Sequence, residues 1–287
     1  MTTTSDRQGL PRVWLGPGAV SDPRALARFG DLAGIPLVAG PVAAGAHRRR
    51  TGRTVVHGLG VGGVDHEDAR AVGVDAAEEL LGWATARGLS VCVALRGESP
   101  GDLASVLDRL RRSTVGSAVA AVEVDLRTAD DQQVLRSMAR VREAAPRGQL
   151  LLARLSVAAP DLVARARAAV AGGAGAVVVS AQVPLGPGRW WSGPSTAALC
   201  LSGLRELRAA AAEQRWPGAP LVAAGGVHDA ASALAAVDAG ASAVQLGTAL
   251  WADPLLLWAV RSALEPGRPA HAPHPHTRGG PRPPEST

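Results

Sequence analysis

Pro220-Leu-Val-Ala-Ala-Gly-Gly-Val227 and Ala239-Gly-Ala-Ser-Ala-Val-Gln-Leu-Gly-Thr248 are two short apolar segments that each end in glycine ahead of a helix-like segment. Glycine at such a turn lets backbone N–H groups approach an anion closely. The helix that follows adds the positive end of its dipole. Two such turns on neighbouring strands predict a cradle for a phosphate group. The spacing of the two segments matches the last two strands of a β/α barrel, where phosphate sites are common.

The same strand-like composition recurs along the chain. Eight apolar segments are short, rich in Val, Leu or Ala, and bounded by Gly, Pro or polar residues, as buried parallel strands are. Helix-like segments separate most of them, and this alternation predicts an α/β fold, a single closed (β/α)8 TIM barrel. The expected strands are Val13–Pro17, Ile35–Gly40, Ser90–Arg96, Val119–Leu126, Gln149–Ser156, Gly175–Ala181, Pro220–Gly226 and Ala243–Thr248. The expected helices are Asp65–Arg87, Pro100–Arg112, Ala129–Ala144, Pro160–Ala171, Pro194–Gln214, His228–Ala239 and Pro254–Leu264.

The two ends of the chain differ from its middle. We expect residues 1–10 to be disordered and the barrel to occupy residues 11–264. Residues 265–287 are rich in Pro, Gly and His and have no apolar period, which predicts a disordered tail. His271, His274 and His276 lie in that tail. Loose histidines lack the fixed geometry of a metal site, so we expect no bound metal.

Composition excludes several classes of protein. The chain has 287 residues, 47% of them hydrophobic, which is enough for one large core. No apolar run reaches membrane-spanning length, and the first residues lack the basic-then-apolar order of a signal peptide. Two cysteines are too few for a disulfide framework, and Cys92, inside an expected strand, is interpreted as a buried, inert thiol. We therefore expect a cytoplasmic protein that is not bound to a membrane.

The basic residues are all of one kind. All 30 are arginine, and lysine, asparagine and tyrosine are absent. The missing residues mostly have AT-rich codons, so a GC-rich genome explains the bias. The net charge is only +5, so nucleic-acid binding is not implied, and Arg48-Arg49-Arg50 is expected to be a solvated loop. The expected partner is a small-molecule substrate.

An ordered set of turns in the last third of the chain resembles one known family. Ser192-Gly193-Pro194, then Gly225-Gly226-Val227, then Ala239 to Thr248, then Asp253-Pro254 are similar to the C-terminal third of the dihydroorotate dehydrogenases, which are FMN-dependent barrels. The resemblance implies FMN as the cofactor and a homodimer as the family's default assembly. It can be followed more faintly from about Val13 to Asp253. It places the flavin phosphate on Gly193, Gly225, Gly226, Gly247 and Thr248.

The resemblance also gives three catalytic candidates, each of which departs from the family. The family's fifth-strand lysine corresponds to Arg154, and its second-strand lysine is lost near Ala39–Gly40. Arg154 would keep a positive charge near the flavin ring and so count as both a cofactor-binding and a catalytic candidate, although its planar fork is larger than an ammonium group. The family's catalytic cysteine corresponds to Thr128, which needs another group to activate it. His57 has the natural pKa for base work.

The family's substrate-binding asparagines are replaced as well. They correspond to His57, Gly63, Asp125 and Asp130. Asparagine offers a donor and an acceptor to the amide edge of a pyrimidine, whereas ionised aspartate only accepts. Asp125 and Asp130 would also repel the carboxylate of orotate, and each lost hydrogen bond costs about 1–3 kcal/mol. These departures weigh against oxidation of dihydroorotate itself.

Three functions remain open at this point. The leading one is an FMN-dependent oxidoreductase that moves a hydride between a dihydropyrimidine-like substrate and flavin, in pyrimidine biosynthesis if the family activity is kept. The second is a barrel without catalysis that serves as a ligand-binding or partner subunit. The third is a sugar-phosphate enzyme without flavin, because the same cradle binds any phosphate monoester. Trp190-Trp191, expected on a loop, would either stack on flavin or substrate or cover the barrel mouth.

Overall fold

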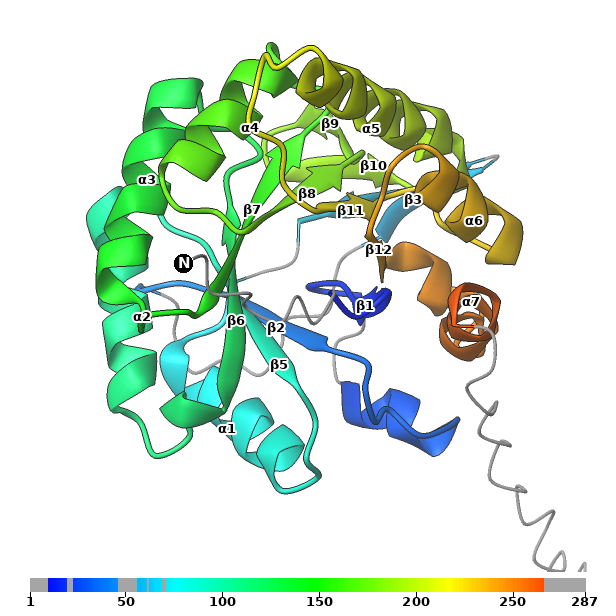
Figure 1. Ribbon diagram of the computed structural model, residues 1–287. Helices are drawn as coiled ribbons and strands as arrows, with labels where there is room; N and C mark the ends of the chain where they lie inside the picture. The colour runs from blue at the N-terminus through cyan, green and yellow to red at the C-terminus, as the bar shows by residue number, and fades with distance from the viewer. Residues whose placement is uncertain (1–9, 20–22, 46–55, 61, 69–70, 266–287) are drawn as a thin grey trace, which may run out of the picture.

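Eight parallel strands close into a barrel in the computed structural model, which describes residues 10–19, 23–45, 56–60, 62–68 and 71–265. Helices surround the strands (Figure 1). The barrel predicted from the sequence is confirmed, and all eight expected strand segments contribute to it. In the order in which they pair around the barrel, the strands are β1 (Val13–Leu15), β12 (Ala243–Leu246), β11 (Leu221–Ala224), β8 (Ala176–Ser180), β7 (Leu150–Ser156), β6 (Val119–Asp125), β5 (Val91–Leu95) and β2 (Leu37–Val42).

Buried apolar residues on both faces explain why these segments form strands. Every residue of β8 is buried. Val178 packs in a cluster inside the barrel, whereas Val177 and Val179 pack in the larger cluster between strands and helices. Because side chains alternate along a strand, a continuous Val-rich run fills both layers. Cys92 lies in the inner cluster, and burial raises the pKa of its thiol, as expected for an inert cysteine.

The helices follow the strands in the expected alternation. Pro100 opens its helix as predicted, and Ser99 and Asp102 form a reciprocal capping box there. Asp229 and Ser232 form a second capping box. The α-helices are α1 (Val74–Thr85), α2 (Pro100–Arg112), α3 (Asp131–Ala144), α4 (Leu162–Ala171), α5 (Ala197–Ala212), α6 (Ala230–Asp238) and α7 (Leu256–Leu264). The described residues also contain four 3-10 helices, η1 (Pro23–Arg28), η2 (Gly116–Ala118), η3 (Pro194–Thr196) and η4 (Thr248–Trp251).

A second sheet, absent from the sequence-based expectation, is built from two connections of the barrel. It contains β3 (Val56–Gly60) and β4 (Gly63–Glu67), which follow β2, and β9 (Val183–Gly186) and β10 (Arg189–Ser192), which follow β8. Connections that follow barrel strands lie at the carboxyl end of the barrel. The order β3-β4-β10-β9 joins two segments more than a hundred residues apart.

Two expectations are wrong in this region. Asp65–Arg87 was expected to be one helix, but Asp65, His66 and Glu67 pair with β10 and the helix begins only at Val74. Pairing with a distant strand overrides the local helical pattern here. Trp190-Trp191 lie in β10, not on a loop.

Several expectations fall outside the described residues. They are the disorder expected for residues 1–10, of which only residue 10 is described, the loop expected at Arg48-Arg49-Arg50, and the tail with its three histidines. Glu265 is described and pairs with Arg261 of α7 at 3.4 Å. In the part of the chain that the structure describes, no helix has the length and apolar content needed to cross a bilayer.

Candidate functional site

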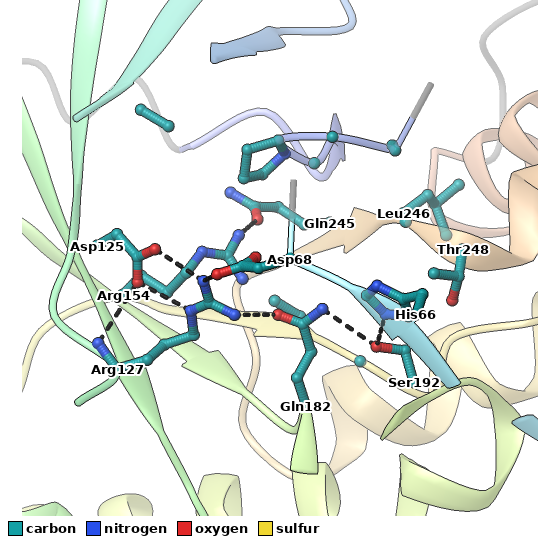
Figure 2. A pocket seen from close by; sticks show the side chains of 18 of the residues that line it. His66, Asp68, Asp125, Arg127, Arg154, Gln182, Ser192, Gln245, Leu246 and Thr248 are labelled. Carbon is teal, nitrogen blue, oxygen red and sulfur yellow. Dashed lines mark hydrogen bonds and ion pairs between the residues drawn. The ribbon is translucent and has the colours of Figure 1, made fainter. Parts of the chain in front are cut away.

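A pocket opens at the carboxyl ends of the barrel strands (Figure 2). Strand ends and the connections that follow them supply its walls, and the second sheet contributes His66 and Ser192. In β/α barrels this end of the barrel carries the active site. The pocket's lining residues are Gly16, Pro17, Gly18, Ala19, Pro41, His66, Asp68, Ala94, Arg96, Glu123, Asp125, Arg127, Arg154, Gln182, Ser192, Gly193, Ala224, Gly225, Gly226, Val227, Gln245, Leu246, Gly247, Thr248, Ala249 and Trp251.

Three glycine-containing turns line this pocket. They supply all five residues expected to hold a phosphate, which we call the phosphate cradle: Gly193, Gly225, Gly226, Gly247 and Thr248. The structure shows no acceptor within the described chain for the backbone N–H groups of Gly225, Gly226 and Gly247. Unpaired N–H groups at glycine turns are what a phosphate oxygen needs.

The cradle glycines differ in why glycine is present. At Gly226, φ is +74°, and a Cβ would lie 2.2 Å from the Cα of Ala197 at the start of α5. At Gly247, a Cβ would meet nothing within 4 Å. Packing of the turn therefore requires Gly226, whereas the space beside Gly247 is open for a ligand.

A layer of polar side chains crosses the barrel interior below the pocket. Arg154 is 6% exposed and its Nε donates to Glu123 Oε1 at 2.6 Å. Its two terminal nitrogens donate to Gln245 and, at 3.4 Å, to Ser180. Gln245 also donates to Glu123 Oε2 at 2.6 Å. The charge of Arg154 is thus balanced by a fully buried carboxylate, which the sequence did not reveal.

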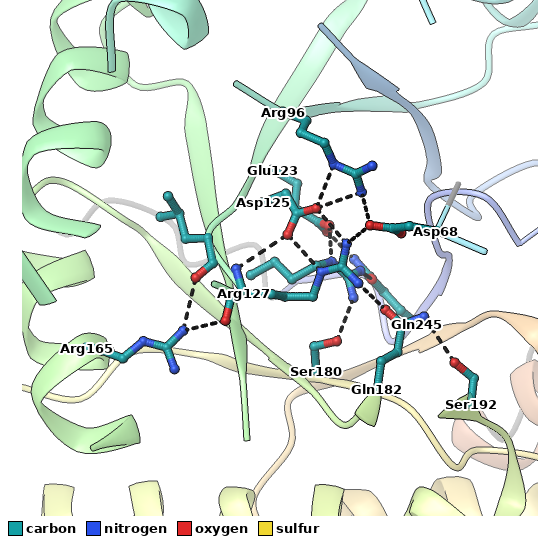
Figure 3. Close-up of polar contacts among 12 residues, drawn as sticks. Asp68, Arg96, Glu123, Asp125, Arg127, Arg165, Ser180, Gln182, Ser192 and Gln245 are labelled. Atoms are coloured by element: carbon teal, nitrogen blue, oxygen red, sulfur yellow. Dashed lines mark hydrogen bonds and ion pairs between the residues drawn. The ribbon is translucent and has the colours of Figure 1, made fainter. Parts of the chain in front are cut away.

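Four charged side chains above this layer form what we call the ion cluster: Asp68, Arg96, Asp125 and Arg127 (Figure 3). Arg127 binds Asp125 through two nitrogens at 2.8 Å each, and its Nη2 lies 2.9 Å from Asp68. Arg96 Nη2 lies 2.9 Å from Asp125 and 3.0 Å from Asp68. Each cation contacts both carboxylates, so the cluster is internally neutral.

This pairing sets the protonation of Asp125. Burial alone raises the pKa of its carboxyl, but the charges of Arg127 and Arg96 outweigh burial and hold that pKa well below its usual range. Burial likewise lowers the pKa of Arg127, and the adjacent Asp125 and Asp68 more than compensate, so it is raised. The expectation that Asp125 presents a repelling charge to an anionic substrate is therefore corrected, because two arginines neutralise it.

Arg127 is held in place from two sides. Its guanidinium carbon lies 4.3 Å from the ring centre of Trp190, a cation–π contact. Arg165 of α4 is buried and donates to the backbone oxygens of Leu126 and Arg127 at 3.0 and 3.3 Å. Burial lowers the pKa of Arg165. Trp190 serves the ion cluster and does not line the pocket.

A chain of hydrogen bonds runs from the ion cluster to His66. Arg127 Nη1 lies 2.7 Å from Gln182 Oε1, and Gln182 Nε2 lies 3.1 Å from Ser192 Oγ. Ser192 Oγ lies 2.8 Å from His66 Nε2, and His66 Nδ1 lies 2.7 Å from the backbone oxygen of Glu67. Figure 2 shows these side chains facing one another in the pocket.

Two of the three catalytic candidates lie away from the pocket. His57 is on β3, exposed, with its Nε2 3.4 Å from Glu67 Oε1. Thr128 is exposed and is not among the pocket-lining residues. Asp130, expected to face a substrate, is exposed and caps α3 by accepting from the backbone N–H of Gln133 at 2.7 Å. Arg154 lines the pocket as expected.

Sequence reasoning missed most of the polar pocket residues. Asp68, Arg96 and Gln182 come from three different connections and belong to no local motif. His66 lay inside the expected helix. Ser192 and Gln245 stood in the quoted motifs but were given no role. Among the described residues, no group of three or more His, Cys, Asp or Glu side chains is placed to hold a metal ion.

Comparisons with known proteins reveal a similarity of structure and none of sequence. No protein-family model matches the chain. No curated protein sequence matches it either. A crystal structure of dihydroorotate dehydrogenase from Eimeria tenella, in complex with ferulenol, superposes with a TM-score of 0.69 over 88% of this chain and 80% of that one. The chain has the fold of a dihydroorotate dehydrogenase. At 14% identity, the likeness to that enzyme concerns the fold alone.

Proposed function

We propose that this dihydroorotate-dehydrogenase-like barrel binds FMN and acts as an oxidoreductase on a small, dihydropyrimidine-like molecule. The observation that carries the proposal is the phosphate cradle, because three turns separated in sequence contribute all five expected phosphate-binding residues to the lining of one pocket. If these turns only closed the barrel, we would expect their backbone N–H groups to be paired with acceptors in the chain. Their lack of such acceptors supports a bound anion. The open space beside Gly247 leaves room for such a group.

Different residues of the chain would contact different parts of the cofactor. The cradle would hold the phosphate, while Arg154 lies beneath the pocket in the barrel interior. A guanidinium has five N–H donors, and three of those of Arg154 are engaged by described residues, which leaves two for a ligand. When bound, flavin supplies hydride acceptance from a C–H bond. Glu123 neutralises the charge of Arg154. Arg154 would therefore act on the flavin ring mainly through hydrogen bonds and not through net charge.

The ion cluster bears on the substrate. Dihydroorotate carries a carboxylate, and the pocket's cations above the barrel interior, Arg96 and Arg127, already contact Asp68 and Asp125. A substrate carboxylate would have to displace these partners at a cost in free energy. The cluster therefore supports a neutral substrate with amide edges over dihydroorotate.

Two observations favour a second candidate function. The ion cluster opposes binding of the family's carboxylate substrate, and Thr128, at the position of the family's catalytic cysteine, is exposed and does not line the pocket. The barrel would bind FMN or another phosphate ligand as a ligand-binding or partner subunit without turnover. Flavin bleaching under anaerobic conditions, with dihydroorotate and dihydrouracil as probes, separates the two. Bleaching by either compound supports the oxidoreductase, and a stable flavin spectrum with both favours the subunit.

The first experiment is the visible spectrum of the purified protein, followed by titration with FMN and with riboflavin, which lacks the phosphate. We expect FMN to bind far more tightly than riboflavin. Gly247→Asp places a carboxylate in open space beside the phosphate, where two like charges about 4 Å apart repel by about 4 kcal/mol at an effective dielectric constant of 20. FMN affinity should fall at least about tenfold.

Gly247→Asn is the matched control, since it has the same shape without the charge. Its affinity for FMN should stay much closer to that of the wild type. Equal losses in both variants would show that shape and not phosphate charge matters at Gly247. Failure of the wild-type protein to take up FMN would refute the cofactor assignment.

A further inference from the structure

The hydrogen-bond chain that ends at His66 has only one consistent direction. Arginine can only donate, so Arg127 makes the Oε1 of Gln182 an acceptor and leaves its Nε2 as a donor to Ser192. The backbone oxygen of Glu67 can only accept, so His66 carries a proton on Nδ1. In neutral His66 the Nε2 is therefore bare, and it accepts the hydroxyl proton of Ser192.

This direction determines what Ser192 can offer a ligand. A serine hydroxyl has one proton and two lone pairs. With His66 neutral, the proton points to His66 and only a lone pair is left for the pocket. A lone pair repels a phosphate oxygen. Neutral His66 thus turns the hydroxyl of Ser192 away from an anion.

Protonation of His66 reverses the last link. Imidazolium donates from both nitrogens, so Nε2 donates to Ser192 and Nδ1 still donates to Glu67. Ser192 then accepts from both His66 and Gln182. Its own proton is released and can be donated to an anionic oxygen in the pocket. All four groups keep every hydrogen bond in this second arrangement.

The location fits an anion at the cradle. Ser192 precedes the cradle residue Gly193, and both line the pocket with His66. The ring of His66 meets Trp251 edge-on, with ring centres 5.6 Å apart, and Trp251 ends the short helix that begins at the cradle residue Thr248. Ser192 and His66 are 5% and 4% exposed, so their charges and protons are shielded from bulk water.

We propose that Ser192 and His66 form a proton-coupled donor to the phosphate in the cradle, so that binding of a phosphate monoester draws one proton onto His66. The proposal rests on the proposed function, since it needs the phosphate in the cradle. The anion would favour the imidazolium, and by reciprocity a lower pH would favour the anion. Among the described residues, the charged or titratable groups on the elements around His66 are Asp65, Glu67 and Asp68 on and after its own strand, Arg189 on β10, His57 on β3, and Arg127.

Of the two described histidines next to the cradle, His66 is the one that bonds Ser192, whereas His228 bonds the backbone oxygen of Gly226. Arg189 pairs with Asp65, His57 lies within ion-pair distance of Glu67, and Asp68 belongs to the ion cluster. Histidine is the side chain whose charge changes between pH 5 and pH 8. The phosphate itself has a second pKa of about 6, so near pH 8 it arrives fully ionised and cannot be the group that takes up a proton.

The test is calorimetric titration of the full-length protein with FMN near pH 8 in buffers of different ionisation enthalpy. The slope of heat against that enthalpy gives the number of protons taken up. We expect an uptake approaching about one proton per FMN and an affinity that rises up to about tenfold per pH unit as the pH falls. Riboflavin, which has no phosphate, should bind without proton uptake.

Two variants locate the proton. His66→Gln should bind FMN without proton uptake, and a thermal melt confirms that it is folded. Ser192→Ala should also lose the uptake, because the hydroxyl connects His66 to the anion. FMN binding without uptake in the wild type, or with full uptake in either variant, overturns this inference and leaves the cofactor assignment standing. A protein that binds no FMN overturns both.

Discussion

At the scale of single residues, glycine after a short apolar strand occurs for two different physical reasons. Gly226 and Gly247 both stand in turns that follow short apolar strands, and both line the pocket. Gly226 has positive φ and abuts the backbone of α5 at Ala197. Gly247 has negative φ and no neighbour on its open side. One glycine is fixed by packing, and the other borders open space in the pocket.

This difference gives a prediction about stability. Gly226→Ala places a Cβ 2.2 Å from a backbone atom at φ +74°, which should lower the free energy of unfolding by about 2–4 kcal/mol through strain and overpacking. Gly247→Ala should change it by less than about 1 kcal/mol, because nothing opposes the methyl group. Urea unfolding of the two variants beside the wild type measures both. Similar losses at the two positions would contradict the distinction.

At the scale of elements, the carboxyl end of the barrel is linked by side chains that cross its interior. Side chains alternate along each strand, so Glu123 of β6, Arg154 of β7 and Gln245 of β12 all point inward one step above the apolar interior layer. Gln245 thereby connects β12 to β6 and β7, which are not its neighbours in the barrel. Their hydrogen bonds satisfy a carboxylate that is fully buried.

A double-mutant cycle tests this link. Arg154→Met leaves Glu123 buried without its cation and should cost about 3–5 kcal/mol of unfolding free energy. In Glu123→Gln/Arg154→Met the buried charge is gone, and a substantial part of that loss should be recovered. Urea unfolding of both single variants and the double variant gives the coupling. Additive losses would show that the two charges do not depend on each other.

The elements also show which parts of the fold and of the site could be predicted from the sequence. All eight barrel strands were predictable because each is a locally apolar run buried on both faces. That the cradle glycines line one pocket was predictable because they stand in turns after strands, which are visible in the sequence; phosphate binding there stays a prediction. The local pattern from Asp65 onward predicts a helix and misses β4, because its pairing partner β10 is more than a hundred residues away. The ion cluster has no local signature, because Asp68, Arg96 and Asp125 meet only when the barrel closes.

At the scale of the whole molecule, the ion cluster ties together the mouth of the barrel. Asp68 follows β4, Arg96 follows β5, and Asp125 ends β6, so the cluster joins the second sheet to two barrel strands. Arg165 adds α4 through the backbone at Arg127. The arrangement links the walls of the pocket through ion pairs and hydrogen bonds of the chain itself.

This role makes global stability depend on acid pH in a specific way. The pKa of Asp125 is depressed in the folded protein, so its charge contributes stability that is fully present above the ordinary aspartate range near pH 3.9 and is lost as the pH falls toward the folded pKa. Asp125→Asn should therefore cost about 3–5 kcal/mol near pH 7. Below about pH 3.9 the gap between wild type and variant should narrow by about 1.4 kcal/mol per pH unit.

Urea unfolding at several values between pH 7 and pH 3 measures that gap. Asp108→Asn is the control, because Asp108 is a half-exposed residue of α2, 3.7 Å from Arg111, and surface pairs contribute at most about 1 kcal/mol. Its gap to the wild type should stay small at every pH. If the Asp125→Asn gap were constant from pH 7 to pH 3, the carboxyl would have the same pKa folded and unfolded. The ion cluster would then not be what holds the mouth of the barrel together.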